Sequence, residues 1–198
     1  MIEIRNLCKS YENKKVYEHL NLQIEEGQIT YLLGASGFGK TTLLRILAGL
    51  EGYDEGEILG LHGKRISYVF QEDRLMPWLT VEENICYVLK GLDKKEQEKR
   101  LLWSLRLMKL EAERKSNVQA LSGGMKRRVA IARALVYDSE ILLLDEPFKG
   151  LDDRLKWEII KELTCYWQEK KQTVLIVGHD SALAKKFNNH MELESLIS

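Results

Sequence analysis

Apolar residues along the chain follow two different patterns that distinguish two kinds of strand. Residues 2–7 and 20–24 alternate apolar and polar side chains, which predicts antiparallel strands with one face in water. Continuous apolar runs at 28–33, 141–144 and 173–177 predict strands buried on both faces, as in a parallel sheet. We therefore expect an α/β fold with a mostly parallel sheet and an N-terminal antiparallel β sub-domain.

Other stretches carry apolar residues at helical spacing. Thr80 and Glu83 form a T-x-x-E capping box, and Asp93 caps a second predicted helix. Only helices are predicted between residues 72 and 120, so we place an inserted helical sub-domain there. The remaining segments, 1–71 and 121–198, are expected to form the α/β core of a single domain. Within that core, residues 57–59 and 65–70 are predicted to form a hairpin around a turn at His62-Gly63.

Composition narrows the class of protein. The chain has 198 residues, of which 44% are hydrophobic and 30% charged, which suits a globular domain with a sizeable core. Lys+Arg and Asp+Glu number 30 each, so no nucleic-acid partner is expected. No apolar run approaches the roughly 20 residues of a membrane span, and the N-terminus lacks a signal-peptide pattern. Three scattered cysteines are typical of reduced thiols in a cytosolic protein.

A glycine-rich stretch joins the strand at 28–33 to a predicted helix at 42–48. It reads Gly34-Ala35-Ser36-Gly37-Phe38-Gly39-Lys40-Thr41, followed by Thr42. Between a strand and a helix, the pattern G-x-x-x-x-G-K-T predicts a phosphate-binding loop, because backbone N–H groups and a helix N-terminus surround the anion. Lys40 can reach the outer phosphates of a nucleotide, and the Thr41 hydroxyl can bind Mg²⁺. These residues are candidates for binding the phosphates of a nucleotide.

Two of the buried strands end in polar side chains that can act on a bound phosphate. Asp145 and Glu146 follow the run at 141–144, and His179 follows the run at 173–177. Ligand groups in such sheets come from the carboxyl ends of the strands. We therefore expect Asp145 to hold Mg²⁺ through a water, Glu146 to polarise the attacking water and His179 to contact the γ-phosphate.

A second predicted helix also begins with bare backbone N–H groups. Ser122 can cap the helix at 125–136, and Gly123 and Gly124 leave N–H groups open at its start. Taken alone, this stretch favours a capped helix without a ligand, with an anion site as the alternative.

The order of the motifs resembles the ATP-binding cassette (ABC) ATPases, the nucleotide-binding subunits of ABC transporters. The resemblance covers nearly the whole chain. It rests on the loop at 34–41, Gln71, Leu-Ser-Gly-Gly-Met at 121–125, the strand at 141–146 and His179. The LSGG stretch upstream of a hydrophobic Asp-Glu-Pro is far more specific than the loop alone.

This resemblance implies roles for single residues. Tyr11 would stack on adenine, and Gln71 would bind Mg²⁺ and sense a partner. Glu146 would be the catalytic base, and His179 the switch histidine. Asp152 would lie in a loop that couples the two sites of a dimer.

The resemblance also implies partners. ABC ATPases pair head to tail, so residues 122–124 of one chain would close the ATP held by the other. Dimerisation would then position Lys40, Glu146, His179 and Mg²⁺ for hydrolysis. The expected partners are a second copy of the chain and an integral membrane permease. The expected location is cytoplasmic, peripheral on the inner face of the cell membrane.

Two segments are similar to the nitrate, sulfonate and taurine branch of bacterial importers. These are residues 70–81 and the stretch Asp-Glu-Pro-Phe-Lys-Gly-Leu-Asp at 145–152. In that branch the segment after the glutamine receives a helix of the membrane subunit, which makes Leu75, Met76 and Trp78 candidates for this contact. An equally good interpretation places these three side chains in the core of the helical sub-domain.

The chain departs from the family pattern at two motif positions. Met125 replaces the usual glutamine, and Gly178 replaces the usual threonine before the histidine. Because Ser122 and the glycines are kept, we expect contact with ATP to survive. Two other functions stay open from the sequence: a soluble ABC-type ATPase of a cytosolic assembly, and a catalytically weak nucleotide-binding module.

Overall fold

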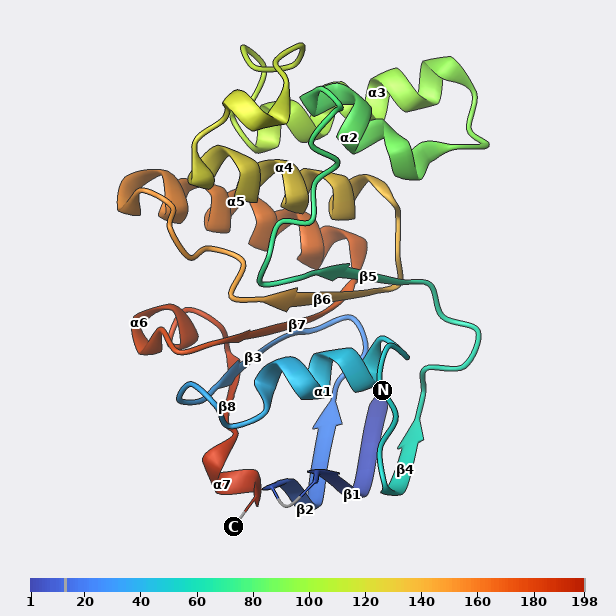
Figure 1. The fold of residues 1–198 in the computed structure, drawn as a ribbon, viewed down its shortest axis with the longest axis vertical. Helices are drawn as coiled ribbons and strands as arrows, with labels where there is room; N and C mark the ends of the chain where they lie inside the picture. Colours follow the sequence, from blue (N-terminus) through green and yellow to red (C-terminus); the bar gives the residue numbers. More distant parts are fainter. Residues whose placement is uncertain (13, 198) are drawn as a thin grey trace. The chain divides into compact units, whose positions relative to one another are not determined.

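The chain forms two compact units, each assembled from separate stretches of sequence (Figure 1). The computed structural model describes residues 1–12 and 14–197. The first unit comprises Met1–Tyr68, Glu140–Glu146 and Trp167–Ser198, and the second comprises Val69–Ser139 and Pro147–Tyr166.

A three-stranded antiparallel sheet begins the first unit. It contains β1 (Ile2–Tyr11), β2 (Lys14–Ile24) and β4 (Glu55–Leu59) in the order β2-β1-β4. Ile4 of β1 lies opposite Leu22 on one side and Ile58 on the other. The alternation of apolar and polar residues therefore predicted the first two strands correctly, although both are longer than the alternating segments.

The hairpin predicted from residues 57–59 and 65–70 is wrong. The strand β4 pairs with β1, whereas β5 (Ile66–Val69) joins the other sheet beside β6 (Ile141–Asp145). Each strand thus has a partner that is distant in sequence, and the turn at His62-Gly63 links two sheets instead of two neighbouring strands.

The second sheet of five strands carries the sequence motifs at one edge. Its order is β5-β6-β7-β3-β8, with β3 at Ile29–Leu33, β7 at Thr173–Gly178 and β8 at Asn189–Glu192. The pairs β3–β7, β3–β8 and β6–β7 are parallel. Leu33 lies opposite Gly178, and Asp145 lies opposite Val177. The carboxyl ends of β3, β6 and β7 therefore meet, as the sequence predicts.

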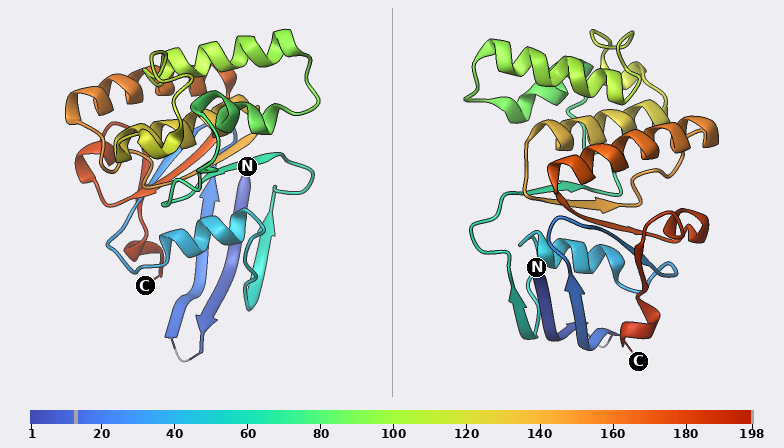
Figure 2. Two further views of the ribbon diagram at one scale, coloured as in Figure 1. Left: turned by 45° about the horizontal axis from the view of Figure 1, so that its top comes forward. Right: turned by 180° about the vertical axis from the view of Figure 1, so that it is seen from behind.

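Helix α1 (Lys40–Leu47) packs between the two sheets of the first unit (Figures 1 and 2). Its Leu43, Leu44 and Leu47 are at most 1% exposed and share an apolar cluster with side chains of β1, β2, β6 and β7. Burial of each leucine contributes about 1.5–3 kcal/mol. The glycine-rich loop thus leads into a firmly packed helix. Two short helices, α6 (Ser181–Ala184) and α7 (Glu194–Ile197), also belong to this unit.

The second unit is built mainly from helices. They are α2 (Val81–Cys86), α3 (Lys94–Leu107), α4 (Gly123–Val136), α5 (Asp153–Lys170, whose last turn belongs to the first unit) and two 3₁₀ helices, Tyr87–Leu89 and Val118–Ala120. The predicted caps are present, because Thr80 and Glu83 exchange hydrogen bonds and Asp93 accepts from Glu96 N–H. The unit includes α4 and most of α5, so the predicted sub-domain boundary at 72–120 stays a prediction.

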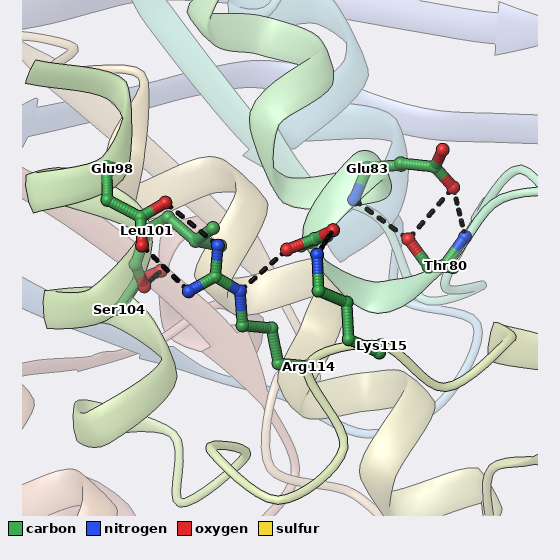
Figure 3. A network of polar contacts seen from close by, with 8 residues as sticks. Thr80, Glu83, Glu98, Leu101, Ser104, Arg114 and Lys115 are labelled. Carbon is green, nitrogen blue, oxygen red and sulfur yellow. Dashed lines mark hydrogen bonds and ion pairs between the residues drawn. The ribbon is translucent and has the colours of Figure 1, made fainter. Parts of the chain in front are cut away.

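Arg114 links two helices of this unit, α2 and α3 (Figure 3). The Arg114 guanidinium donates to Glu82 at 2.6 Å and to both oxygens of Glu98, at 2.7 and 2.8 Å. These carboxylates raise the pKa of Arg114 further above its usual value. The bidentate geometry links α2 to α3 near the capping box of Thr80 and Glu83.

No helix within residues 1–12 and 14–197 has both the length and the apolar character of a membrane span. Cys8, Cys86 and Cys165, all in the described part of the chain, are free thiols.

Candidate functional site

The glycine-rich loop curls at the carboxyl end of β3. The N–H of Gly34 donates to the carbonyl of Gly178 at 3.1 Å, which joins the loop to the end of β7. Gly37 and Gly39 both have a φ of 88°, in the left-handed region that glycine adopts without strain. A Cβ on Gly39 would lie 2.6 Å from Val16 Cγ1, so packing also requires a glycine there.

Lys40 lies inside this curl. Its ammonium donates to the carbonyls of Gly34 and Ala35 at 2.6 and 2.7 Å, and the residue is only 6% exposed. Residues 35–38 are exposed around it. A buried cation beneath an exposed loop at a helix N-terminus is suited to bind the phosphates of a nucleotide.

Tyr17 of β2 contacts the same loop, a contact that the sequence pattern did not reveal. Its hydroxyl donates to the carbonyl of Gly39 at 2.5 Å, and the side chain is 1% exposed. Burial raises the pKa of Tyr17, so the hydroxyl keeps its proton at neutral pH. Through Tyr17, the antiparallel sheet therefore contacts the loop at Gly39, the residue that precedes Lys40.

Replacement of Tyr17 by phenylalanine is expected to weaken ATP binding up to about tenfold. The Gly39 carbonyl keeps its bond from Leu43 N–H, so the loss is that of one hydrogen bond, about 0.5–1.5 kcal/mol. Titration with a fluorescent ATP analogue measures the affinity. Tyr53→Phe, at an exposed tyrosine of the same unit, is the control. Unchanged affinity would limit Tyr17 to a role in stability.

Thr41 and Asp145 meet, as expected for two ligands of one cation. The Thr41 hydroxyl donates to Asp145 Oδ2 at 2.7 Å, and the hydroxyl of Tyr68 lies 3.4 Å from the same oxygen. Asp145 is 2% exposed. A hydroxyl and a carboxylate are hard oxygen donors of the kind that bind Mg²⁺ together with substrate phosphates, so this pair fits the metal.

Glu146 and His179 form the other pair at this edge. His179 Nδ1 lies 2.8 Å from Glu146 Oε1, and the side chains are 55% and 10% exposed respectively. Glu146 has a φ of 45°, an uncommon conformation for a residue with a side chain. Its N–H donates to the carbonyl of Val177, which helps to hold it there. Backbone strain of this kind is often found at functional sites and costs about 1–3 kcal/mol.

Tyr11 ends β1, and several polar side chains surround it. Its hydroxyl donates to Glu51, and the Lys9 ammonium lies 4.7 Å from its ring centroid. Lys9 and Arg45 both pair with Glu51, at 3.5 and 3.4 Å. Tyr11 as a residue is 43% exposed. Stacking on adenine stays a prediction.

In the second unit, residues 122–124 begin α4. Ser122 Oγ accepts from Met125 N–H at 3.3 Å, so it caps the helix as expected. Ser122 and Gly123 are exposed, and a Cβ on Gly124 would lie 3.2 Å from the carbonyl oxygen of Gly150. The first N–H groups of a helix lack partners within it, so this helix start can donate to an anion.

Arginines of α4 hold the segment around Gln71, which sequence reasoning also missed. Arg127 is 4% exposed and donates to the carbonyls of Gln71 and Pro147, both at 3.1 Å. Arg133 donates to the carbonyls of Asp73 and Arg74. The side chain of Gln71 is exposed. In the sequence, the stretch Lys-Arg-Arg at 126–128 looks like an exposed basic face of a helix, so the burial of its arginines could not be predicted.

Gln71 and residues 122–124 belong to the second unit, whereas residues 34–42, Asp145, Glu146 and His179 belong to the first. In the second unit, Asp152 Oδ1 accepts from Leu155 N–H at 3.2 Å at the start of α5. The coupling role expected of Asp152 stays a prediction.

Known proteins are similar in sequence over the part of the chain that carries these motifs. The profile of a family described as ABC transporter matches residues 17–149. The aliphatic sulfonates import ATP-binding protein SsuB of Bacillus cereus is 42% identical over 194 residues, which cover 94% of this chain and 76% of that protein. The spermidine/putrescine import ATP-binding protein PotA of Spiroplasma citri is 41% identical, covering 91% of this chain and 55% of that protein.

Solved structures agree with these relatives. A dimer of the ATP-binding cassette MJ0796 in a post-hydrolysis state, bound to ADP and Pi, has a TM-score of 0.88 to this chain at 30% identity. The alignment covers 97% of this chain and 94% of that one. Together with the importer relatives, it confirms the resemblance drawn from the motifs. The chain therefore belongs to the ABC transporter family and is one of its ATP-binding subunits.

Proposed function

We propose that the chain hydrolyses ATP at the edge of the five-stranded sheet, with Lys40 on the phosphates, Glu146 as general base and His179 beside it. The observation that carries this assignment is the convergence of three strand ends. They bring the loop at 34–41, Asp145, and the Glu146–His179 pair of 2.8 Å to one edge. Tyr11, which is partly exposed, stacks on the adenine ring.

Magnesium belongs to this site as well. Thr41 and Asp145 would hold the ion, because their oxygens lie 2.7 Å apart. The role of Gln71 as a further ligand stays a prediction from the family resemblance. When bound, Mg²⁺ neutralises charge on the phosphate oxygens. Asp145 accepts a hydrogen bond from the Thr41 hydroxyl and so orients it, while Glu146 takes a proton from the attacking water.

The ATP-driven dimer of the family gives a role to the exposed N–H groups at the start of α4. Ser122, Gly123 and Gly124 of one copy donate to the ATP bound by the other, and hydrolysis releases the two copies.

The subunit energises an importer, and the branch resemblance together with the sulfonate-importer relatives points to the nitrate, sulfonate and taurine type. These relatives favour an importer over a soluble assembly ATPase. The chain lies on the inner face of the cell membrane against a permease. Trp78, 73% exposed, contacts the permease, flanked by the half-buried Leu75 and Met76. The side-chain amide of the buried Asn84 accepts from Met76 N–H and donates to the Met76 carbonyl, which holds this segment.

Replacement of Trp78 by alanine is expected to reduce recovery of the permease about tenfold or more, because exposed tryptophans are frequent binding hot spots. The tagged chain is purified from solubilised membranes, and the multi-span protein that accompanies it is quantified. Tyr87→Ala, at another exposed aromatic of the same unit, is the control. ATP binding by the isolated chain is expected to be unchanged in both variants.

The two parts of this test have separate outcomes. If no multi-span membrane protein accompanies even the unmodified chain, a soluble assembly ATPase is favoured. If the permease is recovered equally with Trp78→Ala, the contact lies elsewhere and the importer assignment stands. A phosphate-release assay on the same complex excludes or supports the catalytically weak module.

A further inference from the structure

Tyr31 occupies the space beside Gly178 at the end of β7. A Cβ on Gly178 would lie 2.3 Å from the Tyr31 hydroxyl oxygen, closer than packed atoms approach, and 3.1 Å from Cζ, a tight contact. Tyr31 lies opposite Ile176 in the sheet, and residues 176 and 178 face the same side. The tyrosine ring therefore lies along β7 and fills the place of a side chain at 178.

The buried position of Tyr31 is well defined. The residue is 1% exposed, and its ring stacks on Phe187 with centroids 6.0 Å apart and planes inclined by 10°. Burial raises the pKa of Tyr31 to about 12, so the hydroxyl is neutral under ordinary conditions. A neutral, fixed phenol can both donate and accept a hydrogen bond.

The hydroxyl holds the segment that carries His179. The Tyr31 hydroxyl oxygen would lie 2.3 Å from a Cβ at Gly178, and a hydrogen bond with the backbone of Asp180 lowers the pKa of Tyr31 against the larger effect of burial. The carbonyl of Gly178 accepts from Gly34 N–H at 3.1 Å. Asp180 also accepts from Leu183 N–H and thereby caps α6. Since His179 itself is more than half exposed, its ring has little packing of its own and depends on the residues at either side.

We propose that Tyr31 is a positioning residue that fastens the Gly178–Asp180 segment so that His179 faces Glu146. Gly178 and Tyr31 form a matched pair, because the small residue leaves the space that the large one fills. The Tyr31 hydroxyl occupies the place that a hydroxyl-bearing side chain at position 178 would take. Its effect on turnover rests on the proposed roles of Glu146 and His179.

The first test replaces Tyr31 with phenylalanine, which keeps the ring and its stacking but removes the hydroxyl. The turnover number of the purified chain is expected to fall about threefold to tenfold because the catalytic pair is less well aligned. The KM for ATP is expected to change less than about twofold, because Lys40 keeps its bonds to the carbonyls of Gly34 and Ala35. Tyr53→Phe is the control.

The second readout needs no nucleotide. In protein labelled with ¹⁵N-histidine, the His179 ring is assigned by its loss in His179→Gln. Its two nitrogens are expected to have the separate shifts of one tautomer, because Nδ1 faces a carboxylate. In Tyr31→Phe the two shifts are expected to move toward each other. An unchanged ring signal together with a wild-type turnover number would overturn the proposal, and so would a loss of thermal stability alone.

Substitutions at positions 178 and 31, made singly and together, test whether the two residues compete for the same space. Gly178→Thr alone is expected to lower the melting temperature and turnover sharply, because Tyr31 occupies the space. Combination with Tyr31→Ala is expected to restore part of both, so the double variant performs better than the sum of the single effects predicts. Additive losses would contradict the matched pair. If Glu146→Gln turned over normally, the proposed base would fail, while the histidine signal would still report on Tyr31.

Discussion

Replacement of Glu146 by glutamine is expected to slow ATP hydrolysis about 10²–10⁴-fold, the range that a general base contributes, while ATP binding is retained. Glutamine has nearly the same shape and keeps a hydrogen-bonding group for His179 at 2.8 Å. It cannot accept a proton from water, however. Phosphate release measures the loss, and equilibrium titration with ATP measures the binding.

The same variant should trap the dimer, since ATP would remain bound between two copies. A sizing column run with Mg²⁺ and ATP is expected to show a dimer of Glu146→Gln and a mostly monomeric unmodified chain. Glu140→Gln is the matched control, because Glu140 precedes the same strand but pairs with Arg65 on the surface. Normal hydrolysis by Glu146→Gln would place the base elsewhere, and a variant that binds no ATP would point to a structural defect.

Replacement of Lys40 by alanine is expected to reduce turnover about 10²–10³-fold and to weaken ATP binding at the same time. The ammonium supplies charge to the phosphates, and the loss of one such donor typically costs about 3–4 kcal/mol of transition-state stabilisation. Because Lys40 also bonds the carbonyls of Gly34 and Ala35, its loss should loosen the loop. Calorimetric titration with ATP and a phosphate-release assay separate the two effects.

Lys64→Ala is the control for removal of a positive charge from the same unit, since Lys64 pairs with Glu26 on the surface. Circular dichroism and a cooperative thermal transition show whether Lys40→Ala is folded. If the folded variant bound ATP with normal affinity, the loop at 34–41 would not be the nucleotide site that we propose.

Much of the site could be predicted from the sequence, because it depends on backbone geometry set by neighbouring residues in the chain. The pattern of Gly34 to Thr41 between a strand and a helix predicted the loop, and Ser122 was correctly expected to cap the following helix. The meeting of Thr41 and Asp145 followed from a general property of parallel sheets, whose strands end at a common edge.

The hairpin predicted around His62-Gly63 failed for the opposite reason. Two neighbouring strands with a turn between them satisfy every local requirement of a hairpin. Which strands pair, however, is decided by how their faces are buried, and here β4 is completed by β1 and β5 by β6. Burial energy of whole faces outweighs the small advantage of a short connection.

The sequence alone was sufficient to identify the fold class, the family and the residues that meet at the sheet edge, because these follow from periodicity and from contiguous motifs. The folded structure was needed to find Tyr17 against Gly39 and Tyr31 against Gly178. Each of these contacts joins a bulky side chain to a glycine on another element. Such contacts depend on close packing between residues far apart in the chain, which no spacing rule in one sequence records.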